Sequence, residues 1–323
     1  MPLASPQTFT CLTCATLARV STRSIGSKRP KATADTTGSA STAKTKAELG
    51  IGFTGGVIGG LLGGGSGVFY VPALEKVAAL SRPSLHGTAG AANIAVTGVG
   101  AATFALAGGS IDFRAGMGLV VGATLGAFLG AKLILRIPHR FLRWLFVTIL
   151  LATGAKLLLD AAGVGSLRGA TIVPPSLIAN LWFTVPTSLV LGFIIGAWAA
   201  GMGLGGGLLA VPVLMVLYGA DLPTAEGTSL LMFFPNAIVG TVVHARQGTA
   251  DKRLGVILNI GALPGAIVGA LAALALDVRV LSIVFAAFAL LVAVREMYRM
   301  HRTRGETRAA ADSMSSDKRL NEE

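Results

Sequence analysis

Charged residues are scarce in this chain. Asp, Glu, Lys and Arg make up 13% of its 323 residues, whereas about a quarter is usual for a soluble domain. Hydrophobic residues account for 53%, and the mean hydropathy is +0.71. The composition excludes an ordinary soluble globular protein and predicts an integral membrane protein that contacts the lipid bilayer.

Cysteine and histidine are also rare, with two and four residues. Cys11 and Cys14 form a single C-x-x-C pair, which excludes a disulfide scaffold and cannot complete a four-ligand zinc site. The histidines cannot be combined into a metal cluster or a nucleophile with its base. We therefore expect no metal, no cofactor and no enzymatic activity.

A nucleotide-binding motif is missing as well. Residues 201–206 match G-x-G-x-x-G, but no strand precedes them and no ribose-binding acid follows about twenty residues later. No G-K-[ST] sequence completes a P-loop. A transport function would therefore be driven by a gradient of protons or sodium and not by ATP.

Basic residues outnumber acidic ones, and the formal net charge is +12. Of the 27 Lys and Arg residues, seven precede residue 50 and seven follow residue 294. A nucleic-acid-binding domain would instead spread them along one face. This distribution is typical of membrane flanks, and we expect no nucleic-acid partner.

The first 47 residues are rich in Ser, Thr, Ala, Lys and Arg and contain one acid, Asp35. Such a segment cannot build a hydrophobic core, so we expect a disordered tail or an organellar transit peptide. The corresponding location is the plasma membrane or, for a transit peptide, an organellar membrane such as the mitochondrial inner membrane.

Apolar stretches fill the chain between residues 49 and 298. Most have the length of about 20 residues that a helix needs to cross a bilayer. Two are longer, and each of these is interrupted by a glycine cluster. We predict an all-α, polytopic transmembrane bundle with broken helices. The stretches are 49–80, 87–109, 115–135, 141–159, 177–218, 227–245, 254–276 and 278–298.

The chain also contains one pattern twice. Residues 52–74 and 192–214 share their glycines and a Val-Pro pair at an offset of 140 residues. Downstream the offset is 139, and glycines at every fourth position match, namely Gly122, Gly126 and Gly130 with Gly261, Gly265 and Gly269. Glycines with this spacing favour close helix packing. A duplication of about 110 residues in an apolar chain predicts a transporter with two homologous repeats.

The duplication defines the predicted organisation. We expect transmembrane repeats at 48–160 and 177–298, joined by a linker at 161–176. The chain outside them is the N-terminal tail, 1–47, and a hydrophilic C-terminal tail, 299–323, which we expect to be disordered. The sequence assigns no oligomeric state.

The charges of the loops predict how the two repeats are oriented across the membrane. If each long stretch crosses the membrane once, the loops carry six Lys and Arg inside and seven outside. If each long stretch returns or crosses twice, they carry nine inside and four outside. Lys132, Arg136, Arg140 and Arg143 are then inside, as the positive-inside rule expects. We predict that the two repeats are inverted.

The two glycine clusters form the predicted substrate site. Each glycine costs about 1 kcal/mol in a helix relative to alanine, and the half-helix after a break begins with unpaired N–H groups and partial positive charge. Polar residues inside spans are costly and are candidates for the same site. The alternative is that the glycines serve packing and the asparagines join helices. The predicted binding residues are Gly63, Gly64, Gly65, Ser66, Gly67, Thr88, Asn93, Gly203, Gly205, Gly206, Gly207, Thr228, Ser229 and Asn236.

Four titratable residues are not included in the predicted site. Glu226 and Asp112 lie too near the loops to be expected as ion-coupling acids. His86 and His244 lie at the ends of apolar stretches, where an interfacial histidine is favoured over a proton relay.

The duplicated motifs resemble a known family. G-F-x-x-G, G-x-G-G-G and V-P-x-L, followed by Pro, G-T and G-A-x-x-G-A, are similar to the sulfite exporter TauE/SafE family, also called the 4-toluene sulfonate uptake permeases. The resemblance covers about residues 50–298 and departs at Ser66, where the family pattern has glycine.

The resemblance implies a secondary transporter of small sulfur-containing oxyanions, such as sulfite, sulfoacetate or other organosulfonates. Two homologous halves would enclose one site and expose it to either side in turn. An anion channel, or a transporter of another small organic anion, remains the alternative.

We predict that a cysteine introduced beside Arg140, in a chain with Cys11 and Cys14 replaced by serine, reacts with an impermeant thiol reagent from the cytoplasmic or matrix side. The inverted arrangement places this loop there with its basic neighbours. Mass spectrometry of vesicles of known orientation measures the modification. Labelling from the opposite side alone would contradict the inverted repeats.

Overall fold

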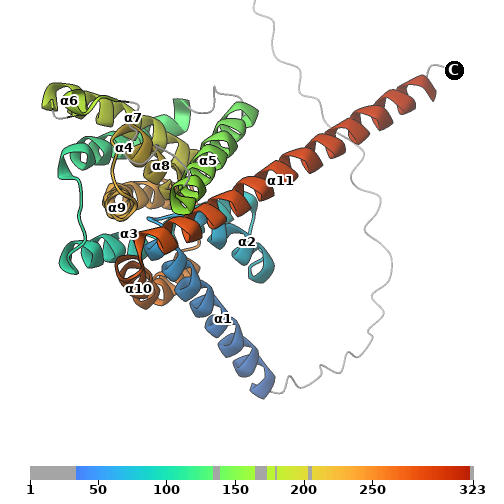
Figure 1. Ribbon diagram of the computed structural model, residues 1–323. Helices are drawn as coiled ribbons and strands as arrows, with labels where there is room; N and C mark the ends of the chain where they lie inside the picture. Colours follow the sequence, from blue (N-terminus) through green and yellow to red (C-terminus); the bar gives the residue numbers. More distant parts are fainter. Residues whose placement is uncertain (1–33, 134–138, 164–172, 179, 203–205, 321–323) are drawn as a thin grey trace, which may run out of the picture. The chain divides into compact units, whose positions relative to one another are not determined.

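The described residues of the protein are helical. The structure is a computed structural model, and it describes residues 34–133, 139–163, 173–178, 180–202 and 206–320. The chain divides into two compact units, Met1–Ala40 and Ser41–Glu323, and the second contains all contacts discussed below. The described residues form helices and no strand, which confirms the predicted all-α class (Figure 1). Cys11 and Cys14 lie outside the described residues.

The bounds of the helices follow the predicted apolar stretches closely. Six of the helices, α3, α5, α7, α9, α10 and α11, contain segments long and apolar enough to cross a membrane. Within the described residues, α8 and the central part of α4 are shorter apolar helices. The bounds are α1 (Ala34–Leu61), α2 (Gly67–Val77), α3 (Arg82–Leu106), α4 (Phe113–Leu133), α5 (His139–Ala162), α6 (Pro175–Ile178), α7 (Leu181–Met202), α8 (Gly207–Leu217), α9 (Leu222–Arg246), α10 (Lys252–Ala275) and α11 (Val278–Leu320).

Both long apolar stretches are divided at their glycine clusters. In the first, α1 ends at Leu61 and α2 begins at Gly67; in the second, α7 ends at Met202 and α8 begins at Gly207. Gly63 and Gly64 adopt φ values of +68° and +97°, a backbone conformation that favours glycine. The Gly64 N–H donates to the Gly59 carbonyl at 2.7 Å and closes the end of α1. The first cluster therefore ends one helix and frees the chain to start another.

Close glycine packing joins α1 to α10. A Cβ atom on Gly52 or Gly56 would lie 2.5 Å from the carbonyl oxygen of Leu258 or Ala262. From the other side, a Cβ on Gly265 would collide with the Phe53 carbonyl oxygen. The two backbones therefore touch, as small residues allow in membrane helices.

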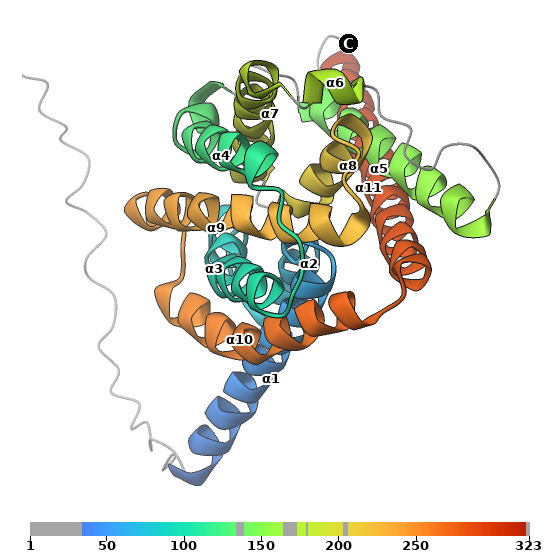
Figure 2. The ribbon, with the colours of Figure 1, turned by 60° about the vertical axis from the view of Figure 1, so that its left-hand side comes forward.

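A second pair, α7 and α4, makes the same kind of contact. A Cβ on Gly192 would lie 2.5 Å from the Leu119 carbonyl oxygen, and one on Gly126 would collide with the Phe193 carbonyl oxygen. Figures 1 and 2 both show α4 lying beside α7. In each pair, a helix that precedes the 161–176 linker packs on a helix that follows it. Gly130 and Ala131 lie outside the residues whose surroundings the structure describes.

Two long helices, α3 and α9, occupy the interior between these pairs. They pack against each other, α3 also packs on α10, and α9 also packs on α4. Their buried faces include polar side chains as well as apolar ones, among them Thr88, Asn93, Thr97, Glu226, Thr228, Ser229 and Asn236. Burial of this many polar groups in an apolar bundle is costly, so these two helices are the first place to look for a site.

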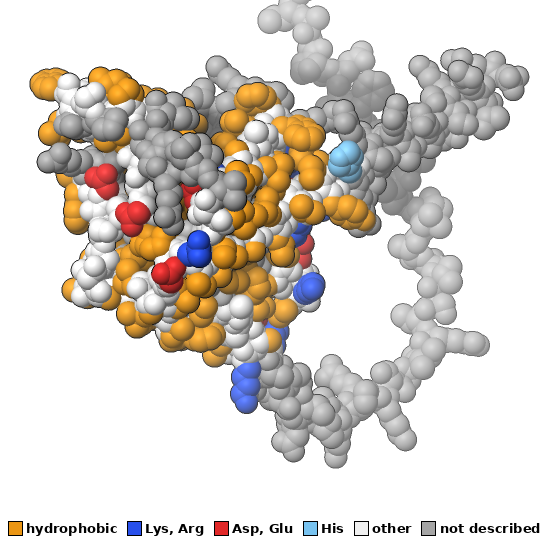
Figure 3. Space-filling view, in the orientation of Figure 1, with side chains coloured by type: hydrophobic (Ala, Val, Ile, Leu, Met, Phe, Trp, Pro, Cys, Tyr) orange, Lys and Arg blue, Asp and Glu red, His pale blue; other side chains and the backbone are white. Residues whose placement is uncertain are grey.

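The outer surface carries large hydrophobic side chains. Phe128 on α4, Trp182 on α7, Val256 on α10 and Leu291 on α11 are each more than half exposed. Figure 3 shows hydrophobic side chains across much of the described surface in that view. Soluble monomers rarely expose apolar area on this scale, and lipid tails would cover it in a bilayer.

Helices extend beyond the apolar core at both ends of the described chain. Residues 34–47 belong to α1, and residues 299–320 continue α11, although the sequence predicted disordered tails there. Both segments contain several Ala and Lys or Arg residues, whose helix propensity is high. The sequence reading considered whether these segments could build a core and did not consider local propensity.

We predict that Gly56→Ala lowers the stability of the protein. The new Cβ would lie 2.5 Å from the Ala262 carbonyl oxygen. Overpacking of this kind costs about 1–3 kcal/mol, against about 1 kcal/mol gained by removing a glycine from a helix. Gly50→Ala, on the same helix with no atom within 4 Å of the new Cβ, is the matched control. Thermal unfolding in detergent compares the variants, and an unfolding midpoint for Gly56→Ala at or above that of Gly50→Ala would contradict the packing.

Candidate functional site

A cavity of about 50 Å³ lies where the two glycine clusters meet α3 and α9. A water molecule needs roughly 10–15 Å³ of such volume, so the cavity has room for a small ligand. Both the chain before the linker and the chain after it line the cavity. The lining residues are Gly64, Gly90, Asn93, Thr97, Ala199, Ala200, Gly206, Phe233, Asn236, Ala237, Gly240, Thr241 and His244.

The two glycine clusters are in direct contact beside this cavity. A Cβ on Gly207 would collide with the Gly63 carbonyl oxygen and lie 2.7 Å from the Gly64 carbonyl carbon. A Cβ on Gly65 would lie 3.0 Å from Leu208 Cγ. The contact leaves no room for larger residues, and it brings the starts of α2 and α8 together.

Both half-helices start in the same way. The N–H groups of Phe69 and Tyr70 donate to the Ser66 carbonyl, each at 2.9 Å, and those of Leu209 and Ala210 donate to the Gly206 carbonyl at 2.9 and 3.0 Å. An α-helix leaves its first N–H groups without intrahelical partners and carries partial positive charge there. Gly206, which precedes α8, lines the cavity, so the positive end of this helix borders it.

Two of the predicted hydroxyl groups hold the first break in place. Ser229 Oγ donates to the Gly63 carbonyl oxygen at 2.7 Å, and the Ser66 hydroxyl donates to Asn93 Oδ1. Both serines are fully buried. Gly67 is buried as the first residue of α2. These three residues stabilise the backbone next to the cavity, and none of them lines it.

Thr88 and Thr228 lie at the ends of the interior helices and away from the cavity. Thr88 Oγ1 accepts a hydrogen bond from the Asp251 N–H, and Thr228 Oγ1 accepts one from the Asp112 N–H, each at 3.0 Å. The two bonds join equivalent positions, because Thr228 follows Thr88 by 140 residues and Asp251 follows Asp112 by 139. The predicted threonines thus tie helix starts to neighbouring loops.

The two asparagines are the polar side chains that face the cavity from the middle of α3 and α9. Asn93 and Asn236 are each 5% exposed, and both line the cavity. Asn93 Oδ1 accepts from Ser66, whereas its amide nitrogen donates to no described residue. The Asn236 side chain makes no hydrogen bond to any described residue. These amides are therefore available to a ligand.

A third asparagine, Asn259 on α10, has a structural role. Its Oδ1 accepts from the Ala95 N–H at 2.8 Å, and its Nδ2 donates to the Ala91 carbonyl at 2.9 Å. A regular α-helix pairs these two backbone groups with each other. Asn259 therefore bridges the turn of α3 that carries Asn93 and fixes its position.

The cavity contains no Lys or Arg side chain among the described residues that line it. Its polar groups are amides, the hydroxyls of Thr97 and Thr241, and His244, whose Nδ1 lies 3.0 Å from Thr249 Oγ1. The described residues also include no group of three metal-ligating side chains. An anion here would be held by N–H dipoles and helix starts, as at other helix N-termini.

The structure brings part of the predicted set together. Gly64, Asn93, Gly206 and Asn236 line the cavity, and Gly63, Gly65, Ser66, Gly67, Gly207 and Ser229 support it from behind. Thr88 and Thr228 lie elsewhere. Gly203 and Gly205 lie outside the described residues.

The sequence reading missed most of the face that α9 presents. Phe233, Asn236, Ala237, Gly240, Thr241 and His244 all line the cavity, and their spacing of three and four residues is that of one helical face. Projecting α9 from Asn236 would have found them. A Cβ on Gly240, or on Gly90 of α3, would meet no atom within 4 Å, so these glycines add space to the cavity and do not serve packing.

Comparison with known proteins gives one family and several relatives. The family model for Sulfite exporter TauE/SafE matches residues 2–157 and 188–319. Two proteins named "Probable membrane transporter protein", from Xylella fastidiosa strains 9a5c and Temecula1, are each 30% identical, over 68% and 76% of this chain and 82% and 93% of their own lengths. The "Probable membrane transporter protein YdhB" of Bacillus subtilis strain 168 is 27% identical over 67% of this chain and 84% of its own.

No solved structure matches the chain. The family match covers both glycine clusters, the helices that line the cavity and both glycine-packed helix pairs. Together with the six apolar helices of membrane-spanning length, it shows that the chain belongs to the Sulfite exporter TauE/SafE family and is an integral, multi-pass membrane transporter protein.

Proposed function

We propose that the protein is a secondary transporter of small sulfur-containing oxyanions, with sulfite, sulfoacetate and other organosulfonates as the substrate class. The observation that carries the proposal is the cavity between the two glycine clusters, with two buried amides free to donate to a ligand. The family name supports the substrate class.

The chemistry of the cavity suits a sulfonate or sulfite group. Such a group spreads its negative charge over several oxygens, each of which accepts hydrogen bonds. The amides of Asn93 and Asn236 and the start of α8 can supply donors from different directions. Hydrogen bonds to a charged group contribute about 1.5–3 kcal/mol each. A site without a fixed cation binds the anion with moderate affinity. The substrate can therefore leave on the far side of the membrane.

Helices that precede the 161–176 linker pack on helices that follow it, and this packing supports alternating access. The reciprocal bonds Thr88–Asp251 and Thr228–Asp112 and the matched pairs α1–α10 and α7–α4 are what two repeats related by a two-fold axis would produce. In our proposal, the bodies that rock are these packed helix pairs, around the interior helices α3 and α9. The segments 48–160 and 177–298 would then be repeats of sequence and not separate moving bodies.

The purified protein in proteoliposomes tests this function. We expect saturable uptake of at least one radiolabelled anion from the set sulfite, sulfoacetate and methanesulfonate, with counterflow when the vesicles are preloaded with the unlabelled anion. Sulfate is the comparison anion, and empty liposomes are the background. Flux that neither saturates nor shows counterflow would indicate a channel, and no flux of any anion would contradict the proposal.

We predict that Asn236→Ala weakens apparent substrate affinity by roughly 10-fold to 100-fold, because it removes a hydrogen bond to a charged group. Asn236→Asp keeps the shape but adds negative charge, and we expect it to abolish uptake. The measurement is the concentration dependence of initial uptake.

Thr124→Val is the matched control for these variants. Thr124 lies on α4 outside the cavity lining and donates only to the Val120 carbonyl of its own helix. Its uptake should match that of the wild-type protein. If Asn236→Ala and Thr124→Val had the same apparent substrate affinity, Asn236 would not belong to the binding site.

A further inference from the structure

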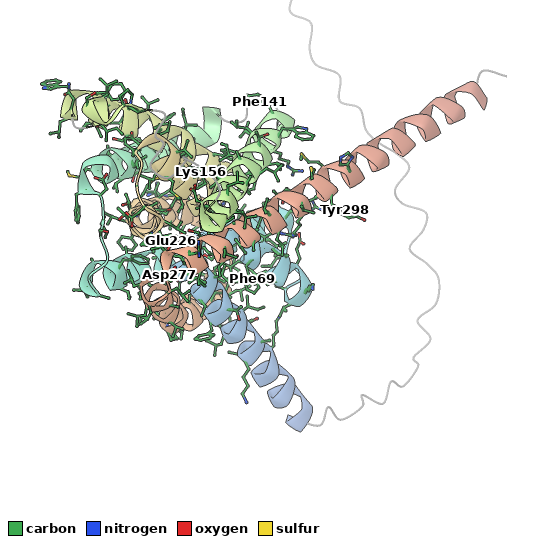
Figure 4. The ribbon with its side chains drawn as sticks, viewed as in Figure 1. Phe69, Phe141, Lys156, Glu226, Asp277 and Tyr298 are labelled. Carbon is green, nitrogen blue, oxygen red and sulfur yellow. The ribbon has the colours of Figure 1, made fainter. Side chains whose placement is uncertain are left out.

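One acidic side chain lies deep in the interior of the described helices. Glu226 on α9 is 0% exposed, and neither of its carboxyl oxygens has a hydrogen-bond partner among the described residues. Figure 4 shows Glu226 amid the helices, whereas Phe141 and Tyr298 lie at the periphery. The sequence reading set Glu226 aside because it is close to a loop. Its burial shows that distance along the chain is a poor measure of depth in the bundle.

Glu226 lies against the first glycine break. A Cβ on Gly63 would lie 3.0 Å from Glu226 Cα, and the Gly63 carbonyl accepts the hydrogen bond of Ser229, three residues further along α9. The next residue, Gly64, lines the anion cavity. The residue against which Glu226 packs therefore directly precedes a lining residue of the anion cavity.

A second, polar cavity lies at the start of α9, the helix that carries Glu226. It has a volume of about 450 Å³ and is lined by Asp221 and Leu222 at the start of α9, together with Lys156, Asp160, Asp277 and Arg279. Glu226 follows Asp221 by five residues, which is about 7.5 Å along a helix. This cavity could supply water and protons to the carboxyl group when the start of α9 shifts.

No Lys, Arg or His side chain among the described ones forms an ion pair with Glu226. Asp221, five residues before Glu226 at the start of α9, carries a charge of the same sign. The helices α7 and α8 contain no titratable side chain. Three other helices carry titratable side chains near their starts. These are Arg82 and His86 on α3, Lys252 and Arg253 on α10, and Arg279 on α11. Asp112, before α4, contributes its N–H to Thr228. The side chains of Arg114 and Lys132 on α4 lie outside the described ones.

The equivalent position in the first repeat also carries a titratable group. His86-Gly87-Thr88 precedes Glu226-Gly227-Thr228 by 140 residues, and the Nδ1 atom of His86 is buried without a partner among the described residues. The next residue, Gly87, packs against His244, which lines the anion cavity: a Cβ on Gly87 would lie 3.1 Å from His244 Cβ. Protonatable side chains thus lie at matched positions of the two repeats.

We propose that Glu226 is the proton-binding site that couples anion transport to a proton gradient, an inference that rests on the proposed transport function. One proton from the solution on one side binds a carboxylate oxygen and gives the neutral acid. The same proton leaves to the other side after the anion has crossed, and no other bond forms or breaks. With a monovalent sulfonate, the pair that crosses is electrically neutral.

The physical reason is the cost of charge in this position. An ionised carboxylate without a partner in an apolar interior costs several kcal/mol or more, whereas the neutral acid is tolerated. The neutral form therefore suits the closed packing against Gly63, and the ionised form requires water from the polar cavity. Loss of the proton thereby favours an opened start of α9.

Transport in proteoliposomes tests the proposal, with radiolabelled methanesulfonate as the probe and sulfoacetate in parallel. The charge of methanesulfonate is constant over the pH range used, and the membrane potential is clamped. In the wild-type protein, an inward proton gradient should raise accumulation at least tenfold over that without a gradient. Glu226→Gln should lose this increase and keep counterflow exchange, which needs no net proton movement.

Glu296→Gln is the matched control. Glu296 is another buried acid, 3% exposed, but it lies 3.9 Å from Arg299, and this variant should keep the gradient-driven accumulation. Accumulation by Glu226→Gln that still follows the proton gradient would overturn the proposal, as would wild-type accumulation that follows a sodium gradient alone. Absence of counterflow in the wild-type protein would instead refute the transport function itself.

A measurement on the wild-type protein covers the case in which Glu226→Gln does not fold. Dicyclohexylcarbodiimide modifies protonated carboxyl groups in apolar surroundings, and mass spectrometry identifies the modified residue. We expect modification of Glu226, increasing at lower pH, with loss of gradient-driven accumulation in proportion. An unmodified Glu226 in protein that has lost this accumulation, or full accumulation by protein modified at Glu226, would overturn the proposal.

Discussion

The contact between the two broken helices is the constraint on which the rest of this molecule depends. Gly207 packs on the carbonyl groups of Gly63 and Gly64 with no space for a side chain. Backbone that is not helical is tolerated at membrane depth only where protein or a water-filled cavity satisfies it. The bundle meets this requirement by placing each break against the other, with Ser229 satisfying the Gly63 carbonyl. The cavity and the polar faces of α3 and α9 are arranged around this contact.

Much of this arrangement follows from the sequence, and the reasons for the remainder are physical. The two densest glycine clusters interrupt helices, so both breaks could be located from the sequence alone. Lining residues such as Thr241 and Phe233 could not, because they depend on which face of α9 turns inward. Thr88 and Thr228 were expected in the site as hydroxyl donors, but backbone N–H groups of Asp251 and Asp112 engage them. The inverted orientation of the repeats stays a prediction.

The glycines of this chain serve two physical purposes that the structure separates. At Gly52, Gly56 and Gly192, an added carbon would meet a backbone carbonyl at 2.5 Å, so these residues bring helices together. At Gly90 and Gly240, it would meet nothing within 4 Å, so these residues leave space beside Asn93 and Asn236. A sequence pattern cannot distinguish the two cases, since both fall on helices with the same composition. The distinction decides which substitutions would affect folding and which would affect transport.

The pairing of α1 with α10 and of α4 with α7 has a consequence for biosynthesis. During translation, α4 is synthesised before its partner α7, and α1 is synthesised long before its partner α10. Each early helix carries a face of glycines whose backbone partner does not yet exist. The first half therefore cannot reach its final packing while the ribosome is still making the second half. Assembly of the bundle is completed only after α10 has emerged from the ribosome.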